Sequence, residues 1–310
     1  MRIVFFGTPQ FAVPTLQNLI ENRYSILAVV TQPDRPKGRH LKIVPSPVKE
    51  LAQKNRIKVL QPHIVGEMGF LEEIASLNAD LFVVISYGKI LPSSLLKIPR
   101  LYSLNVHASL LPKYRGASPI PNALLNQETQ TGVTIMRITE QLDAGDILLQ
   151  RSVSIDPQDD GVTLSEKLSH AGAELMIHAL RVTESGKAVF HPQDENQATY
   201  TKRLKKEDGI IDWSRSSREI EALIRALVPW PSAYTFYQGK RLQLWKVLAK
   251  QRACYGRYGQ VLKVSETEGI EVSTREGVLA LLELQPESRR RMRAIEFASG
   301  YQLRAGDVLG

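Results

Sequence analysis

The stretch of residues 103–116, SLNVHASLLPKYRG, brings together side chains that can act on a carbonyl group. Asn105 and His107 fall near the end of an expected strand, where alternate residues face the same side. An amide N–H and a protonated imidazole can both stabilise the negative oxygen that forms when a nucleophile attacks a carbonyl carbon. Because open parallel sheets bind ligands at the carboxyl ends of their strands, this spacing predicts an oxyanion-stabilising site.

A carboxylate further along the chain completes the candidate site. Asp143 lies in LDAGD, a short glycine-containing loop between two expected strands, from which it can reach the same pocket and accept a proton. Each residue alone also has an ordinary structural interpretation: Asn105 as a turn residue, His107 as a strand-end histidine and Asp143 as a loop cap. The catalytic hypothesis therefore depends on the three acting together.

The segments around these residues narrow the kind of ligand. SLLPKYRG is apolar and carries proline where a connecting loop is usually polar, so we expect it to form the wall of a pocket. The first turn, FFGTPQF, has one glycine and lacks those that let a backbone approach a pyrophosphate. A nicotinamide dinucleotide is therefore disfavoured.

Short β-branched runs alternate with helical patterns in the first half, which predicts an α/β domain with a Rossmann-like, doubly wound, mostly parallel sheet. The expected strands are residues 2–7, 25–32, 57–60, 80–86, 102–108, 132–139 and 146–153, and the expected helices 47–55, 68–78 and 161–185. A capping box of Thr163 and Glu166 is expected to open the last helix, and one of Ser216 and Glu219 the next. Later strands with glycine-bearing turns predict a small antiparallel β-barrel of the oligonucleotide-binding type.

The length of 310 residues favours two domains, because single cores usually stop growing below that size. We expect a catalytic domain at residues 1–190, a polar linker at 191–208 and the β-barrel at 209–310.

The N-terminal apolar run is too short for a signal peptide, and nothing approaches the roughly 20 apolar residues of a membrane span. Cys254 is the single cysteine, which excludes an intramolecular disulfide and a cysteine-based metal cluster. A cytoplasmic monomer with no bound metal is expected.

The formal net charge of +8 is unevenly distributed. Residues 203–310 hold 19 Lys and Arg against 13 Asp and Glu, and a second basic concentration runs over residues 34–58. Arg35, Lys37, Arg39 and Lys42 alternate there with proline and glycine, which predicts an extended loop. Two distant basic regions suggest one extended polyanionic partner, while a solvated surface is the alternative interpretation.

At NVHASLLPKYRG and LDAGD the sequence resembles the folate-dependent formyltransferases. The resemblance implies that Asn105, His107 and Asp143 form a catalytic trio that moves a formyl group from 10-formyltetrahydrofolate to an amine. It also implies folate contacts at Ser109, Leu110, Leu111 and Pro112, and at Tyr87, Gly88 and Ile90 of the segment SYGKILP, where the backbone lines the pterin pocket.

Further segments resemble the members of this family that act on initiator methionyl-tRNA: FFGTPQFAVP, TQPDRPKGR, PSPVK, GVTIM, IDWS and PWPSAY. This resemblance implies that the loop of residues 32–47, with Arg35, Lys37, Arg39 and Lys42, engages the acceptor stem, and that the barrel adds a second basic surface. A formyltransferase acting on a nucleotide-sugar amine is the nearest alternative, and the basic loop argues against it. A non-catalytic RNA-binding protein is disfavoured by the intact trio.

Overall fold

The structure of the chain is a computed structural model that describes residues 1–37 and 42–310, apart from the side chains of residues 37 and 42. Contacts divide the chain into two compact units. Unit 1 comprises Met1–Pro119, Gln130–Ser154 and Ser165–Thr201, and unit 2 comprises Ile120–Thr129, Ile155–Leu164 and Lys202–Gly310. The domain boundaries at residues 190 and 208 stay predictions.

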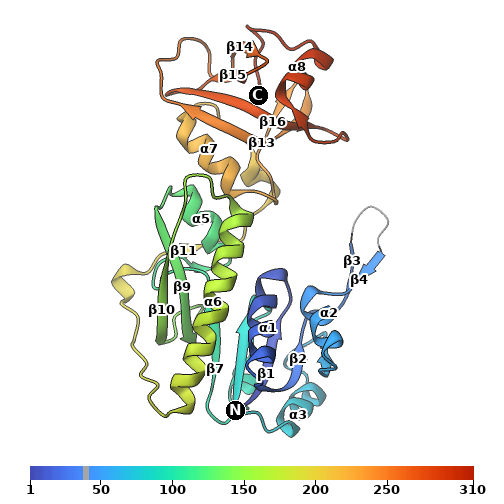
Figure 1. The fold of residues 1–310 in the computed structure, drawn as a ribbon, viewed down its shortest axis with the longest axis vertical. Helices are drawn as coiled ribbons and strands as arrows, with labels where there is room; N and C mark the ends of the chain where they lie inside the picture. Colours follow the sequence, from blue (N-terminus) through green and yellow to red (C-terminus); the bar gives the residue numbers. More distant parts are fainter. Residues whose placement is uncertain (38–41) are drawn as a thin grey trace. The chain divides into compact units, whose positions relative to one another are not determined.

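A seven-stranded sheet forms the centre of unit 1 (Figure 1). In chain order its strands are β1 (Arg2–Gly7), β2 (Ser25–Val30), β5 (Val59–Leu60), β6 (Leu81–Ile85), β7 (Tyr102–His107), β9 (Gln130–Arg137) and β10 (Ile147–Ser154). Their spatial order is β10-β9-β7-β6-β1-β2-β5, with parallel pairing from β5 to β7 and antiparallel pairing of β9 with both β7 and β10. The mostly parallel, doubly wound α/β sheet is confirmed. The strand order reverses beside β1. Counted from that point, β7 is the second strand, and His107 is its last residue.

Helices cover both faces of this sheet. In unit 1 they include α1 (Val13–Glu21), α2 (Pro47–Lys54), α3 (Met68–Ser76), α4 (Ser93–Leu96) and most of α6 (Gly161–Glu184). Val4, Phe6 and Phe82 form one apolar cluster with Ile74 of α3. On the other face, Gly172 of α6 comes so close to Val106 that a Cβ atom there would lie 2.7 Å from its Cγ1. Because both faces are covered, β6 is buried along its whole length.

One predicted helix cap is wrong, although the helix itself begins at Gly161 as expected. The Asp160 carboxylate accepts hydrogen bonds from the backbone N–H groups of Val162 and Thr163, at 2.8 and 2.9 Å. Asp160 therefore caps α6, and the expected box of Thr163 and Glu166 does not open it. The physical reason is that the helix already begins at Gly161, which leaves Thr163 inside the first turn.

Unit 2 is an antiparallel β domain that also takes in helices α7 and α8, most of α5 (Pro119–Leu125) and the start of α6. Its elements are α7 (Ser217–Ala226), β12 (Tyr234–Tyr237), β13 (Lys240–Lys250), β14 (Val261–Ser265), β15 (Gly269–Ser273), β16 (Val278–Pro286), β17 (Met292–Arg293) and α8 (Ala294–Tyr301). The strands follow the order β12-β13-β16-β15-β14, with β17 paired to β16. The Ser216 hydroxyl and Glu219 carboxylate form the predicted capping box at the start of α7. An antiparallel C-terminal domain is confirmed.

Part of the expected linker packs within unit 1. The backbone of His191 pairs with Ile147 of β10, at 2.8 and 2.9 Å. Ten residues later, β11 (Tyr200–Thr201) pairs in parallel with β8 (Arg115–Gly116), directly after the candidate pocket wall. Residues 191–201 therefore lie against the catalytic segment.

Candidate active site

His107 closes strand β7 and is 5% exposed. Its Nε2 atom lies 3.0 Å from the carbonyl oxygen of Tyr114, and its Nδ1 atom lies 3.6 Å from Oδ2 of Asp143. A carbonyl oxygen can only accept, so Nε2 carries a hydrogen in this arrangement. Both neighbours of the ring are acceptors, which suits an imidazole that acts as a donor.

Asp143 is held in a strained, tightly anchored turn between β9 and β10. Its backbone has a φ of 48°, in the left-handed region that aspartate tolerates better than most residues. Its Oδ2 atom accepts the backbone N–H of Gly116 at 2.8 Å while facing His107. At Gly145, a Cβ atom would lie 1.9 Å from the carbonyl oxygen of Arg137, so this turn requires glycine. The backbone thus fixes where the carboxylate points.

Asn105 lies two residues before His107 on the same face of β7, as the strand alternation predicts. It pairs with Val84 on one side and Met136 on the other, so the sheet fixes its backbone. The side chain is partly exposed, and within the described part of the chain its amide has no hydrogen-bond partner. The structure therefore brings the three predicted catalytic residues to one strand end, with an amide free to meet a ligand.

The predicted wall from Ser109 to Pro112 is anchored by two polar side chains that the sequence reasoning missed. Thr134 of β9 donates its hydroxyl to the Ser109 carbonyl at 2.6 Å and accepts the Leu111 N–H at 3.2 Å. Gln150 of β10 donates to the Leu111 carbonyl at 2.8 Å and to the Thr134 hydroxyl at 2.9 Å. The Ser109 hydroxyl donates to the Lys113 carbonyl at 2.6 Å. The only sequence signal was a threonine inside the apolar run GVTIM.

The second predicted folate segment follows β6. Thr8 and Gln32 both donate to the Tyr87 carbonyl, at 3.2 and 3.1 Å, and Gly88 has a φ of 84°. Burial raises the pKa of the Tyr87 hydroxyl to about 12, so the group stays protonated. In residues 1–37 and 42–310, neither this buried hydroxyl nor Oε1 of Gln32 has a hydrogen-bond partner. The Ile90 side chain, in contrast to the buried Tyr87, is 87% exposed.

The two arms of the predicted basic loop form the strands of a short hairpin. Strands β3 (Arg35–Lys37) and β4 (Lys42–Val44) pair antiparallel, with Lys37 opposite Lys42. The extended backbone agrees with the sequence, although the pairing of the two arms was not expected. Arg35 is exposed, the side chains of Lys37 and Lys42 are not described, and Arg39 lies outside the described residues.

A polar network anchors the base of this hairpin. The Lys49 ammonium lies 2.5 Å from Oδ2 of Asp34, and Gln61 donates to the other oxygen at 2.7 Å. These two hydrogen bonds lower the pKa of the Asp34 carboxyl. Gln61 also donates to the Gln32 carbonyl at 2.9 Å, and the Gln32 side chain donates to Tyr87. The hairpin base is therefore joined to the second folate segment.

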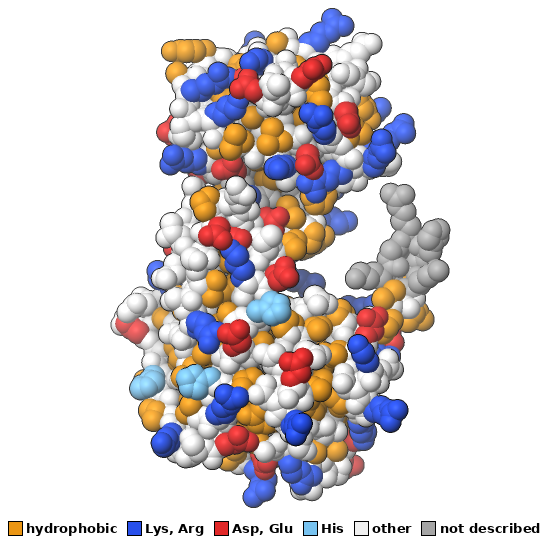
Figure 2. All heavy atoms as spheres, viewed as in Figure 1, with side chains coloured by type: hydrophobic (Ala, Val, Ile, Leu, Met, Phe, Trp, Pro, Cys, Tyr) orange, Lys and Arg blue, Asp and Glu red, His pale blue; other side chains and the backbone are white. Residues whose placement is uncertain are grey.

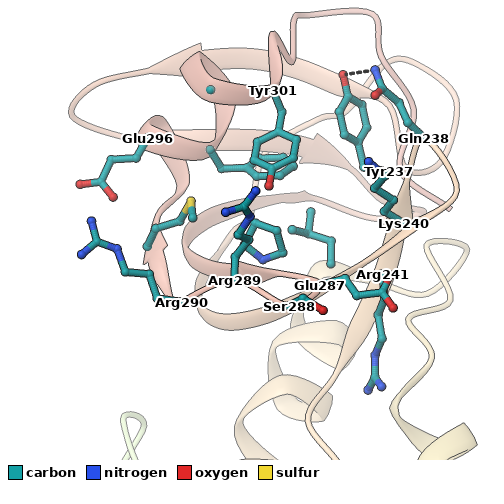
Figure 3. Close-up of a pocket in the computed structure, with 15 residues that line it drawn as sticks. Tyr237, Gln238, Lys240, Arg241, Glu287, Ser288, Arg289, Arg290, Glu296 and Tyr301 are labelled. Carbon is teal, nitrogen blue, oxygen red and sulfur yellow. Dashed lines mark hydrogen bonds between the residues drawn. The ribbon is translucent and has the colours of Figure 1, made fainter.

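Unit 2 carries a basic surface of its own, and Figure 2 shows Lys and Arg side chains across its visible face. A cavity of about 1240 Å³ opens there between the start of β13 and the connection from β16 to α8 (Figure 3). The cavity is lined by Lys240, Arg289, Arg290 and Tyr301, among others. The Tyr301 ring stacks on the Phe297 ring, with 4.5 Å between the ring centroids. Arg291, which follows Arg290, does not line this cavity, and its Nε atom lies 2.6 Å from Oε2 of Glu283.

Two further properties of the described residues bear on the kind of protein. No group of three or more His, Cys, Asp or Glu side chains within them is placed to hold a metal ion. None of the helices they form has both the length and the apolar character that crossing a bilayer requires.

Comparison with known proteins gives the same picture over the whole chain. A family model for formyl transferase matches residues 1–180, and one for the formyl transferase C-terminal domain matches residues 203–302. Methionyl-tRNA formyltransferase from Geobacter sulfurreducens is 46% identical over 310 residues, which cover 100% of this chain and 97% of that protein. The one from Caldanaerobacter subterraneus subsp. tengcongensis is 47% identical and is covered completely.

Solved structures share the fold at lower identity. Methionyl-tRNA formyltransferase from Clostridium thermocellum is similar with a TM-score of 0.57 and 16% identity, over 81% of this chain and 94% of that one. An N-formyltransferase from Helicobacter canadensis, in complex with folinic acid and dTDP-3-aminofucose, gives a TM-score of 0.69 and 21% identity, over 91% and 99%. Together with the full-length relatives, the two matching family models show that this chain belongs to the formyl transferase family and, within it, to the methionyl-tRNA formyltransferases.

Proposed function

We propose that the chain transfers the formyl group of 10-formyltetrahydrofolate to the α-amino group of methionine carried by initiator tRNA, for the initiation of protein synthesis. The observation that carries this function is identity of 44 to 47% to methionyl-tRNA formyltransferases along the full chain. The nucleotide-sugar alternative has weaker support, because the sugar formyltransferases are similar only in fold, at 21% identity.

The trio has a defined part in the proposed reaction. The α-amino nitrogen attacks the formyl carbon, and the carbonyl oxygen becomes the oxyanion of a tetrahedral intermediate. The Asn105 amide and the His107 imidazole stabilise this charge, a contribution of about 3 kcal/mol for each donor. Asp143 orients the imidazole from its position 3.6 Å from Nδ1. The bond from the formyl carbon to N10 then breaks, and the proton lost by the amine is delivered to N10.

The folate site that we propose has two walls. One is the segment from Ser109 to Pro112, which Thr134 and Gln150 hold against the sheet. The other contains Tyr87, Gly88 and Ile90, where the ligand meets backbone groups and an exposed apolar side chain.

For the tRNA we propose two contact regions. In the sequence of the basic loop, positive charge comes from Arg35, Lys37, Arg39 and Lys42, and in unit 2 it comes from Lys240, Arg289 and Arg290. Such side chains bind phosphates and position an RNA without reading its bases. Because the acceptor is a tRNA, we place the reaction in the cytoplasm. A monomer stays a prediction that sedimentation equilibrium can check.

The decisive experiment is formylation with 10-formyltetrahydrofolate and three acceptors: methionine-charged initiator tRNA, methionine-charged elongator tRNA and a nucleotide-linked amino sugar. We expect rapid transfer to the initiator tRNA, much slower transfer to the elongator tRNA and none to the sugar. Preference for the sugar would overturn the proposed acceptor. Absence of transfer to any amine would overturn the enzymatic function.

A further inference from the structure

An arginine in the catalytic segment is buried to an unusual degree. Arg115 is 1% exposed, and it follows Tyr114, whose carbonyl meets His107. Its Nη1 and Nη2 atoms donate to the two carboxylate oxygens of Glu195 at 2.9 and 2.7 Å, and Nη1 donates to the Tyr200 hydroxyl at 3.1 Å. A buried guanidinium is stable only when its donors are satisfied, so this segment and residues 193–200 are held together.

Gln193 lies between this arginine and the Asp143 turn. Its Oε1 atom accepts from Nε and Nη2 of Arg115, at 3.0 and 2.9 Å. Its Nε2 atom donates to the carbonyl oxygens of Asp143 and Gly145, at 2.8 and 2.7 Å. If the amide were flipped, its N–H groups would point at the guanidinium and its oxygen at the two carbonyl oxygens. Only the orientation given above therefore satisfies the hydrogen bonds of the amide.

The Asp143 turn needs such support. The residues just before it, from Glu140 to Leu142, are exposed, so packing does little to fix its tip. Asp143 itself has a left-handed backbone, with a φ of 48°, and its carboxylate makes its contacts to Gly116 and His107 rather than to Gln193. The two hydrogen bonds from Gln193 hold the backbone on either side of Ala144. They therefore determine where the carboxylate sits relative to the imidazole.

We infer that Gln193 is a positioning residue for the formyl transfer: its amide holds the Asp143 turn so that the carboxylate faces His107, while Arg115 and Glu195 hold the amide. This inference rests on the proposed catalytic role of Asp143. A displaced carboxylate affects the chemical step, because a shift of about 1 Å in a catalytic group can lower a rate about 100-fold. The Gln193 amide already bonds to Arg115 and to the two turn carbonyls, so we expect its loss to leave substrate binding intact.

The test compares Gln193→Ala with Gln193→Glu. The glutamate keeps the acceptor for Arg115 and loses the donor to the turn, where it places a carboxylate against two carbonyl oxygens. We expect kcat to fall about 10-fold to 100-fold in both variants, with KM for methionyl-tRNA and for 10-formyltetrahydrofolate within about twofold of the parent. Gln197→Ala is the matched control, because this exposed glutamine of the same segment donates its side-chain hydrogen bond to Asp194. It should keep the parental kcat.

A double-mutant cycle separates positioning from general disruption. In an Asp143→Asn background, which lowers kcat if Asp143 is catalytic, Gln193→Ala should have little further effect, because both changes remove the same carboxylate function. Parental kcat in Gln193→Glu, a rise in KM alone, or full additivity of the two losses would overturn the inference. So would parental kcat in Asp143→Asn. A chain that formylates no amine would overturn the proposed function instead, so the two failures are distinguishable.

Discussion

The catalytic strand end and the β3–β4 hairpin belong to the same unit, yet the structure holds them by different means. His107 meets the Tyr114 carbonyl and faces the Asp143 carboxylate, and the neighbouring Ser109 and Leu111 accept hydrogen bonds from side chains of strands β9 and β10. The hairpin has strands of three residues, and the described contacts concentrate at its base, on Asp34. A reacting group must stay within a fraction of an ångström, whereas a phosphate contact needs only charge within reach. Changes near His107 should therefore affect kcat, and changes in the hairpin should affect KM for tRNA.

The largest effect should come from His107→Ala. We expect kcat to fall about 100-fold or more, because the variant loses a donor to the oxyanion, while KM for methionyl-tRNA changes little. Steady-state formylation kinetics measure both quantities. His178→Ala is the control, because this histidine is exposed on α6 and should be silent. Parental turnover in His107→Ala would remove the residue from the mechanism.

A smaller effect is expected from Thr134→Val, which keeps the shape of the side chain and removes its hydroxyl. The Ser109 carbonyl and the Leu111 N–H then lose their partner, so the free energy of unfolding should fall by about 1 to 3 kcal/mol. KM for 10-formyltetrahydrofolate should rise as the wall loosens. Urea unfolding and formylation kinetics check the two results.

Thr131→Val is the matched control for this change, because Thr131 lies on the same strand and is also buried. Its substitution should leave KM for folate unchanged. If both variants raised that KM equally, the anchoring role of Thr134 would be refuted.

The hairpin should respond in the opposite way. Arg35→Ala removes an exposed charge, so KM for methionyl-tRNA should rise several-fold at low salt while kcat stays near the parental value. The slope of log affinity against log salt should decrease in magnitude by about 1, as expected for one lost phosphate contact. Lys97→Ala removes an exposed charge elsewhere in unit 1 and should leave the slope unchanged. Equal slopes in all three proteins would mean that Arg35 meets no phosphate.

The same comparison explains what the sequence can predict. Asn105 and His107 were placed correctly on one face because strand alternation is a local rule. Thr134 and Gln193 were missed because they act on backbone atoms 25 and 50 residues away, and such pairs are formed only by the packed fold. The start of α6 was predicted correctly, but its cap was assigned to Thr163 in place of Asp160. Both residues are good caps, and the position of the first turn decides between them.

The smallest effect concerns the pH dependence of the hairpin base. The hydrogen bonds from Lys49 and Gln61 lower the pKa of Asp34 in the folded chain, so its ionised form stabilises the fold. This contribution is present above the ordinary aspartate pKa and is lost as the pH falls through the lowered value. The parent should therefore exceed Asp34→Asn in stability at pH 7, by at most about 1 kcal/mol because the pair is partly exposed. The two should converge in acid. Urea midpoints across this pH range measure the difference, with Glu50→Gln on the neighbouring helix as a control. A gap that widened toward low pH would contradict the sign of the shift and leave the hairpin without its ionic anchor.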